Sequence, residues 1–268
     1  LIDGKVSMKS VREVSMVDLL GMKEIELDRS SISNYLYGKK VLVTGAGGSI
    51  GSELVRNCLT FDPDLLILLD QSEHNLFQIE KECNQTKHPV AFQPILGDIR
   101  DKALLERVFA SFKPDVVFHA AAYKHVPMQE DHPWEAILTN IQGTLNLINV
   151  SEEYKVNRFV LVSTDKAVNP TNIMGATKRV AEKLIQSKSV DSNVKYMAVR
   201  FGNVIGSSGS VIPTFQEQIR NGGPITLTDP GMERYFMSIS EAAQLILQAG
   251  AMGDGGEIYV LDMGRPVN

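Results

Sequence analysis

Residues 40–56 read Lys-Val-Leu-Val-Thr-Gly-Ala-Gly-Gly-Ser-Ile-Gly-Ser-Glu-Leu-Val-Arg, an apolar strand that runs into closely spaced glycines and then into a segment suited to a helix. Three of the four glycines, Gly45, Gly48 and Gly51, are spaced three residues apart, with Ser49 and Ile50 between the last two. Glycine permits a tight turn and lets backbone N–H groups approach a pyrophosphate, whose charge is favoured at a helix N-terminus. The strand before and the helix after favour a dinucleotide-binding turn over an ordinary glycine-rich turn.

Apolar runs of strand length alternate with amphipathic segments of helix length from residue 39 onward. This alternation is typical of a parallel sheet covered by helices on both faces. We therefore predict an α/β fold with a doubly wound parallel sheet of the Rossmann type. The predicted strands cover residues 40–44, 65–69, 90–96, 115–119, 158–163 and 194–200, and the longest predicted helices cover residues 133–153 and 171–188.

Three parts are predicted along the chain. Residues 1–37 lack the alternation and are expected to form an N-terminal arm or linker packed on the main domain, residues 38–200. From residue 201 the sequence is glycine-rich, with a capping-box start from Ser238 to Glu241 before a helix ending near Ala251, which predicts a small substrate-binding portion over residues 201–268. A strand over residues 256–261 precedes a last segment where a further helix would begin, so we expect a truncated portion and a piece of a longer protein.

Composition excludes several classes of function. The 268 residues are 43% hydrophobic, and the net charge of −5 with no basic run argues against binding to a nucleic-acid backbone. Cys58 and Cys83 lack metal-ligand spacing, so neither a disulfide framework nor a metal site is indicated. No stretch approaches the ~20 apolar residues of a membrane span, so we expect the chain as given to be soluble.

An acidic residue ends the second predicted strand and indicates which dinucleotide binds. The Asp70 carboxylate is placed to accept hydrogen bonds from the adenosine ribose and would repel a 2′-phosphate, and residues 71–73 offer no arginine for such a phosphate. NAD is therefore predicted rather than NADP. Asp98 and Ile99 follow the third strand, where they would contact the adenine, although Asp98 equally suits a helix N-cap just before Asp101.

Small residues follow the fourth predicted strand. Ala120 and Ala121 leave room for the backbone of a cofactor, although small side chains are also common where a helix packs closely on a sheet.

Polar residues at the end of the fifth strand are the candidate catalytic group. Thr164, Asp165 and Lys166 end this strand, and the next helix carries Met174 and Lys178 four residues apart on one face. Ligands bind outside the carboxyl ends of the strands in such sheets, so these residues would border the nicotinamide. An adjacent carboxylate and ammonium can supply an acid and a base, although such a pair can also be an ordinary solvated loop pair.

Six motifs in order carry a resemblance to a known family. They are Thr-Gly-Ala-Gly-Gly-Ser-Ile-Gly-Ser-Glu-Leu, His-Ala-Ala-Ala-Tyr-Lys-His-Val-Pro, Ser-Thr-Asp-Lys-Ala-Val-Asn-Pro-Thr-Asn, Met-Gly-Ala-Thr-Lys-Arg, Arg-Phe-Gly-Asn-Val and Arg-Tyr-Phe-Met-Ser-Ile. With Leu-Leu-Gly and Glu-Leu-Asp in residues 19–28, they resemble the polysaccharide-biosynthesis branch of the extended short-chain dehydrogenases, and more narrowly the membrane-associated UDP-N-acetylglucosamine 4,6-dehydratases. Met174 stands where a short-chain dehydrogenase holds its tyrosine, so either the site is inactive or the proton transfers have moved to neighbouring groups.

The resemblance implies a redox-neutral dehydration with named roles. NAD takes hydride from sugar C4 and returns it to C6 after water leaves across C5 and C6. Lys166 would be the base at C5, Asp165 the acid at the C6 hydroxyl, and Thr164 a hydrogen-bond partner of the 4-hydroxyl. Lys178 would hold the nicotinamide ribose. The shared methionine is associated with retention of configuration at C5.

Other positions are implied to face the UDP-sugar. Asn203 and Arg234 would line the substrate pocket and offer an amide and a guanidinium to the diphosphate, although Arg234 also suits a surface ion pair with Glu233 or Asp229. Lys124 and His125 would reach substrate or cofactor, although a lone histidine is more often structural. Asn140 would face the site or, equally well, serve as a buried packing amide.

The resemblance also implies a setting. Membrane helices would precede residue 1 in a longer bacterial protein, with this domain on the cytoplasmic side of the inner membrane and pairing with a second copy through helix faces. Two alternatives stay open: a nucleotide-sugar epimerase or reductase, which needs no acid and base at Asp165 and Lys166, and a non-catalytic NAD-binding domain.

Overall fold

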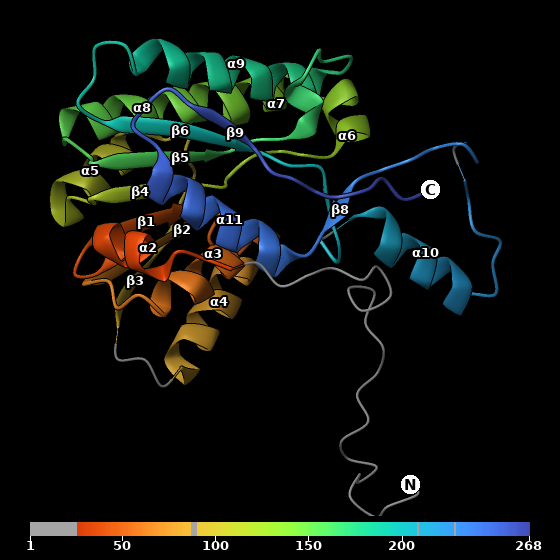
Figure 1. Cartoon of the computed structure of the whole chain (residues 1–268), viewed down its shortest axis with the longest axis horizontal. Helices are drawn as coiled ribbons and strands as arrows, with labels where there is room; N and C mark the ends of the chain where they lie inside the picture. The colour runs from red at the N-terminus through yellow and green to blue at the C-terminus, as the bar shows by residue number, and fades with distance from the viewer. Residues whose placement is uncertain (1–25, 87–89, 208, 228) are drawn as a thin grey trace, which may run out of the picture.

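The architecture is one parallel sheet between two layers of helices (Figure 1). The computed structural model describes residues 26–86, 90–207, 209–227 and 229–268. Seven parallel strands lie in the order β3-β2-β1-β4-β5-β6-β9. Their bounds are β1 Lys40–Thr44, β2 Leu65–Asp70, β3 Ala91–Leu96, β4 Val116–His119, β5 Arg158–Val162, β6 Lys195–Arg200 and β9 Ile258–Val260, and a second sheet pairs β7 Asn203–Val204 with β8 Phe236–Met237.

Alternation along each strand divides the core into two clusters. Val41 and Val43 of β1 point to the face covered by α2 Arg29–Leu36, α3 Ser49–Leu59, α4 Glu73–Gln85 and α11 Ile239–Met252. Leu42 points to the other face, which is covered by α5 Lys102–Phe112, α8 Thr144–Glu153 and α9 Ile173–Lys188. Because successive strand residues face opposite sides, a strand covered on both sides must be apolar throughout, as residues 41–43 are.

The strand order reverses between β1 and β4. From β1 the chain moves outward to β2 and β3, and it then returns to place β4 on the other side of β1. The connections that follow β1 and β4 run in opposite directions. This creates an opening at the carboxyl ends of the two strands. This reversal fixes where a ligand can enter.

The six strands predicted from sequence are confirmed within one residue at each end. The predicted helix over residues 133–153 is instead three consecutive pieces, α7 Pro133–Ala136, the π-helical segment η2 Ile137–Gly143 and α8. The helix predicted to begin at residue 171 begins at Ile173, because the Asn172 side chain accepts a hydrogen bond from Gly175 N at 2.7 Å and caps it. The capping box at Ser238 and Glu241 is present at the start of α11.

Both ends of the described chain join the main domain. The predicted arm contains α2, which the Asp28 side chain caps and which packs against α11 (Figure 1). The Leu-Leu-Gly motif lies outside the described residues. The predicted boundary at residue 201 does not separate two packed units, because β9 pairs with β6 and α11 covers the sheet, whereas α10 Val211–Arg220 has no buried residue and stands apart in Figure 1.

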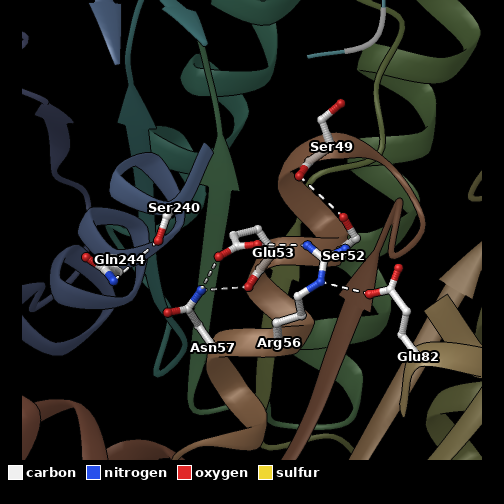
Figure 2. A network of polar contacts seen from close by, with 8 residues as sticks. All are labelled: Ser49, Ser52, Glu53, Arg56, Asn57, Glu82, Ser240 and Gln244. Atoms are coloured by element: carbon white, nitrogen blue, oxygen red, sulfur yellow. Dashed lines mark hydrogen bonds and ion pairs between the residues drawn. The ribbon is translucent and has the colours of Figure 1, made fainter. Parts of the chain in front are cut away.

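Figure 2 shows how α3 is fixed to its neighbour on the outer surface. Arg56 of α3 contacts Glu53 one turn earlier at 2.7 Å and Glu82 of α4 at 2.8 Å. Asn57 donates to the backbone carbonyl of Glu53 at 2.8 Å. These contacts lie far along the helix from its N-terminus at Ser49, so they brace α3 without occupying the end that faces the glycine turn.

Two further observations concern the described residues. Among them, no helix is both long and apolar enough to cross a membrane. Cys58 and Cys83 are both free and buried, and burial raises the pKa of the Cys83 thiol to about 11.

The α2 segment offers a test of whether the arm belongs to the core. Leu36 is fully buried, so Leu36→Ala should lower the free energy of unfolding by about 2–5 kcal/mol through lost burial and the cavity left behind. Tyr37→Ala, at a neighbouring side chain that is 67% exposed, is the matched control and should change stability by less than about 0.5 kcal/mol. Urea denaturation of both variants measures the difference, and equal small effects would show that α2 is not part of the cooperative unit.

Candidate active site

A cavity of about 550 Å³ opens at the carboxyl ends of β1, β4, β5 and β6. Of the site residues predicted from sequence, those that line it are Gly45, Gly48, Ser49, Ile50, Gly51, Ala120, Lys124, His125, Thr164, Lys166, Met174, Lys178 and Asn203. Those that do not line it are Asp70, Asp98, Ile99, Ala121, Asn140, Asp165 and Arg234. The structure therefore brings the glycine turn, the end of β5 and the first turns of α9 to one opening.

The glycine turn is held by close backbone approach. Gly45 has φ +65°, and a Cβ placed there would lie 2.8 Å from Ala121 N. A Cβ on Gly51 would collide with the Gly45 carbonyl oxygen. The close approach of the Ala121 backbone therefore requires glycine at position 45.

The Asp70 carboxylate holds the glycine turn in place through a hydrogen bond. Its side chain is buried, with Oδ2 accepting from Gly47 N and Oδ1 from Ser72 N, both at 2.9 Å. The carboxylate thus shapes the turn that carries the predicted pyrophosphate contacts. Its contact with a ribose stays a prediction.

Asp98 and Ile99 lie beyond the rim of the cavity. Asp98 accepts from Arg100 Nε at 2.7 Å and from Arg100 N at 2.9 Å, while Asp101 caps α5 by accepting from Leu104 N. The alternative of an N-cap at Asp98 is therefore wrong. Burial opposes the charge, yet the hydrogen bonds from Arg100 hold the pKa of Asp98 below its usual range.

The end of β5 turns into a short 3₁₀ helix, η3 Asp165–Ala167. Asp165 Oδ1 accepts from Thr164 Oγ1 at 2.9 Å and from Lys166 Nζ at 3.0 Å, and Lys166 Nζ lies 3.5 Å from Asn203 Oδ1. The Asp165 side chain is 45% exposed and the Lys166 side chain 32%. The pair is half-buried at the cavity edge, where Lys166 faces inward and Asp165 contacts both lining neighbours.

Met174 and Lys178 present adjacent side chains to the cavity from α9, and both are buried. Lys178 Nζ donates to the Val162 carbonyl at 2.6 Å, which ties α9 to the end of β5. Burial lowers the pKa of Lys178 to about 8, and the nearby Glu182 carboxylate opposes that shift. The methionine side chain itself can neither give nor take a proton.

The predicted substrate residues divide into two groups. Lys124 and His125 line the cavity, and burial lowers the pKa of Lys124. Asn140 does not reach the cavity, because its amide accepts from Tyr123 N at 2.8 Å and donates to Tyr123 O and Thr177 Oγ1 at 3.0 Å. Asn140 therefore holds the loop that carries Lys124. This is the role of a buried packing amide, the alternative to a side chain that faces the site.

Arg234 is exposed and lies outside the cavity lining. Its guanidinium donates to the Glu233 backbone carbonyl at 2.8 Å, and its backbone pairs with Val267. The predicted surface ion pair with Glu233 or Asp229 is replaced by this contact to the main chain. Arg234 therefore does not line the pocket in this structure.

Two buried polar networks were missed in the sequence analysis. His119 bridges Thr44 Oγ1 at 2.8 Å and Thr144 Oγ1 at 2.9 Å, and burial lowers its pKa to about 3, which keeps the ring neutral. Glu182 lies fully buried on α9 and binds Ser163 and Arg200. The available signal was a glutamate four residues after Lys178 on the same helix face, together with an arginine at the end of an apolar strand.

Comparison with known proteins identifies the family. The model of the polysaccharide biosynthesis protein family matches residues 41–268. The chain belongs to this family. The capsular polysaccharide biosynthesis protein CapD of Staphylococcus aureus is 51% identical over 269 residues, which is 100% of this chain and 45% of CapD. The chain thus spans less than half the length of that relative.

More distant family relatives include two kinds of enzyme. A UDP-N-acetylglucosamine 4,6-dehydratase (inverting) of Campylobacter jejuni is 35% identical over 83% of this chain and 66% of its own length. A UDP-glucose 4-epimerase of Rickettsia canadensis is 36% identical over 83% of this chain and 65% of its own length. Among solved structures, the dTDP-glucose 4,6-dehydratase DesIV of Streptomyces venezuelae, with NAD bound, has a TM-score of 0.76 and 26% identity over 85% of this chain and 77% of that one.

The pKa of Lys178 can be tested directly. NMR titration of the lysine side chains should show one ammonium that loses its proton near pH 8, because burial disfavours the charged form. Below that pH Lys178 carries its positive charge, and above it the amine is neutral. Lys178→Arg should remove this signal and so assign it, and a Lys178 signal that titrates above pH 10 would contradict the prediction.

Proposed function

We propose that this domain catalyses NAD-dependent 4,6-dehydration of a UDP-N-acetylhexosamine, with UDP-N-acetylglucosamine as the first substrate to test. The observation that carries the proposal is the Asp165–Lys166 pair, 3.0 Å apart at the edge of the cavity that the glycine turn also lines. Its product would be the 4-keto-6-deoxy sugar nucleotide, for synthesis of a bacterial surface polysaccharide. The family match and the dehydratase relative support this class of reaction.

The residues present fit NAD. The close approach of backbone at Gly45 and Gly51 keeps every side chain larger than a methyl group out of the turn over residues 45–48 at the start of α3, where a pyrophosphate is favoured. Asp70 lies directly beneath this turn, and residues 71–73 supply no arginine for a 2′-phosphate. Asp98, Ile99, Ala120, Ala121 and Lys178 would complete the contacts to NAD. When bound, NAD would accept hydride from sugar C4 and return it to C6.

The proton transfers would fall to the turn after β5. Elimination needs one group that takes the proton from C5 and another that protonates the departing C6 oxygen. Lys166, which faces the cavity, would be the base as the neutral amine and Asp165 would be the acid as the protonated carboxyl, the state reached from the ion pair when one proton passes across their 3.0 Å contact. Thr164 lines the same wall, where its hydroxyl would hydrogen-bond the 4-hydroxyl and the developing ketone oxygen. Lys178, while protonated, would add positive charge beside it.

The diphosphate of the substrate would bind to other residues that line the cavity. Lys124 and His125 after β4 and Asn203 after β6 all line the cavity and offer donors to phosphate oxygens. Arg234 would have to turn from its contact with the Glu233 carbonyl to reach the same ligand. We assign the clamp to Lys124 and Asn203 first, because their side chains already lie at the cavity.

An epimerase is the second candidate, because an epimerase relative is as similar as the dehydratase relative. The two differ in what they require of the turn after β5. An epimerase moves hydride at C4 without breaking the bond from C6 to its hydroxyl, so it would not need an acid at Asp165. The mass of the product separates the two reactions, because only dehydration removes one water.

The setting that we propose is a longer protein with membrane helices ahead of this domain, which would lie on the cytoplasmic side of the inner membrane. We also propose that two copies pair through their helices. Trp134 of α7 is 73% exposed and Leu138 of η2 is 42% exposed, so this face offers apolar area for a second copy.

The glycine turn provides a test of NAD binding alone. Gly51→Ala should raise the Kd for NAD by at least about tenfold, because its Cβ must displace the Gly45 carbonyl. Gly231→Ala is the control, since that glycine is exposed and its backbone suits alanine. Isothermal calorimetry measures both, and unchanged NAD affinity in Gly51→Ala would remove the turn from the proposed site.

The acid role is tested by Asp165→Asn, which keeps the shape and removes the proton donor. The rate of water loss from UDP-N-acetylglucosamine, followed by mass spectrometry, should fall about 10²- to 10⁴-fold. NAD affinity should change less than about twofold, because Asp165 does not line the cavity. Asp191→Asn, at an exposed acid just beyond α9, should leave the rate unaltered. Dehydration by Asp165→Asn at the parent rate would refute the assignment.

A further inference from the structure

A buried carboxylate on α9 contacts the ends of two strands at once. Glu182 Oε1 accepts from Ser163 Oγ at 2.6 Å and from Arg200 Nε at 2.7 Å, and its Oε2 accepts from Arg200 Nη2 at 2.5 Å. Arg179 adds a contact at 3.1 Å from the same helix. Burial works against the charge on Glu182, but the hydrogen bonds from Arg200, Ser163 and Arg179 hold its pKa below the usual range.

The contact lies where regular pairing of the two strands stops. The register of β5 and β6 ends at Val162 opposite Val199, and Ser163 N still donates to Val199 O at 2.7 Å. Past that point the main chains meet where Asp165 N donates to Phe201 O at 3.0 Å. Glu182 therefore adds a side-chain link between the two strand ends beside these main-chain contacts.

Each linked residue directly precedes part of the candidate catalytic group. Ser163 is followed by Thr164, Asp165 and Lys166, and Arg200 lies three residues before Asn203, the first residue of β7. Lys166 Nζ lies 3.5 Å from Asn203 Oδ1, so the spacing of the two strand ends sets this distance. A displacement of about 1 Å at such a site can cost about 10²-fold in rate.

We propose that Glu182 is a positioning residue that joins the ends of β5 and β6 and thereby fixes the turn over residues 164–166 against Asn203. This inference rests on the proposed function for its activity readout only. The carboxylate itself is fully buried and absent from the cavity wall, so it acts through Ser163 and Arg200 rather than on a substrate.

The link has a second, electrostatic consequence for Lys178. The negative charge of Glu182, one helical turn away, opposes the effect of burial on the Lys178 ammonium. His119 of β4, which burial keeps neutral, also interacts with Lys178, Lys166 lines the same cavity, and Arg200 of β6 is bound to Glu182. Removal of the Glu182 charge should therefore lower the pKa of Lys178 further.

Three variants of the full chain separate position from charge. Glu182→Gln removes the charge, Glu182→Asp keeps the charge but shortens the reach to Ser163, and Ser163→Ala removes one hydrogen bond and leaves the ion pair with Arg200 intact. Glu82→Gln is the matched control, since Glu82 is also a carboxylate paired with an arginine, Arg56 (Figure 2), and its side chain is 46% exposed. Rates are expressed per NAD-binding site, so that loss of folded protein does not count as loss of activity.

We expect a fall in kcat of about 10- to 100-fold in the two Glu182 variants, with the KM for UDP-N-acetylglucosamine within about threefold. Hydrogen exchange at the amides of residues 164–167 should speed up about tenfold or more in both. The pKa of Lys178 should fall below about 8 in Glu182→Gln alone. Glu82→Gln should match the parent in all three measurements.

Hydrogen exchange at residues 164–167 and the titration of Lys178 can both be measured without turnover. They therefore test the role of Glu182 even if the parent protein does not dehydrate the sugar. If Glu182→Gln does not fold, Glu182→Asp and Ser163→Ala decide it by exchange and kcat. Parent-like exchange at residues 164–167 together with parent-like kcat in the folded variants would overturn the inference. A lowered melting temperature with neither change would show that Glu182 serves stability alone.

Discussion

Parallel pairing places the carboxyl end of every strand at the same edge of the sheet, and the site depends on this constraint. Each strand must be followed by a crossover, so the turns that leave β1, β4, β5 and β6 gather at one edge. The reversal of strand order beside β1 then holds two of these turns apart. Glycines at residues 45–51, small residues at 120–122 and polar residues at 163–166 lie at this opening because each group directly follows a strand.

Charges beneath the opening are stable because each has a partner. Transfer of an unpaired charge into the core costs several kcal/mol, so a buried carboxylate and guanidinium must neutralise each other with satisfied hydrogen bonds. Glu182 and Arg200 meet this condition through two parallel contacts. Lys178 meets it only in part, because its main contact is the neutral Val162 carbonyl, and its pKa is lowered accordingly. The site thus combines a fixed ion pair with a lysine whose charge varies near neutral pH.

The sequence predicted the parts of the fold that depend on local pattern. Strands such as β1 have an apolar centre, here residues 41–43, and glycines or charges follow them, so their bounds follow from residue type. The helix α2 was missed because its pattern is short and weak, and its stability comes from packing of Ile32 and Leu36 against distant α11. Asp70, Asn140 and Arg234 show the same limit at the site, because sequence position cannot indicate which of several nearby donors a side chain contacts.

The Met174 side chain limits which residues of the site can transfer protons. A residue at this position faces the cavity beside Lys178, and a methionine there contributes shape but no proton. Any proton transfer in this part of the cavity must therefore use other groups, such as Lys178 on the same helix and Lys166 after β5. Asp165 and Lys166 stand on a turn in which Asp165 N donates to Phe201 O and Val168 N donates to Asp165 O, and under the further inference Glu182 and Arg200 add a side-chain link beside these contacts. Under the proposed function, α9 carries Met174 where a tyrosine would transfer a proton. The turn after β5 takes over that role, and side-chain contacts hold it in place.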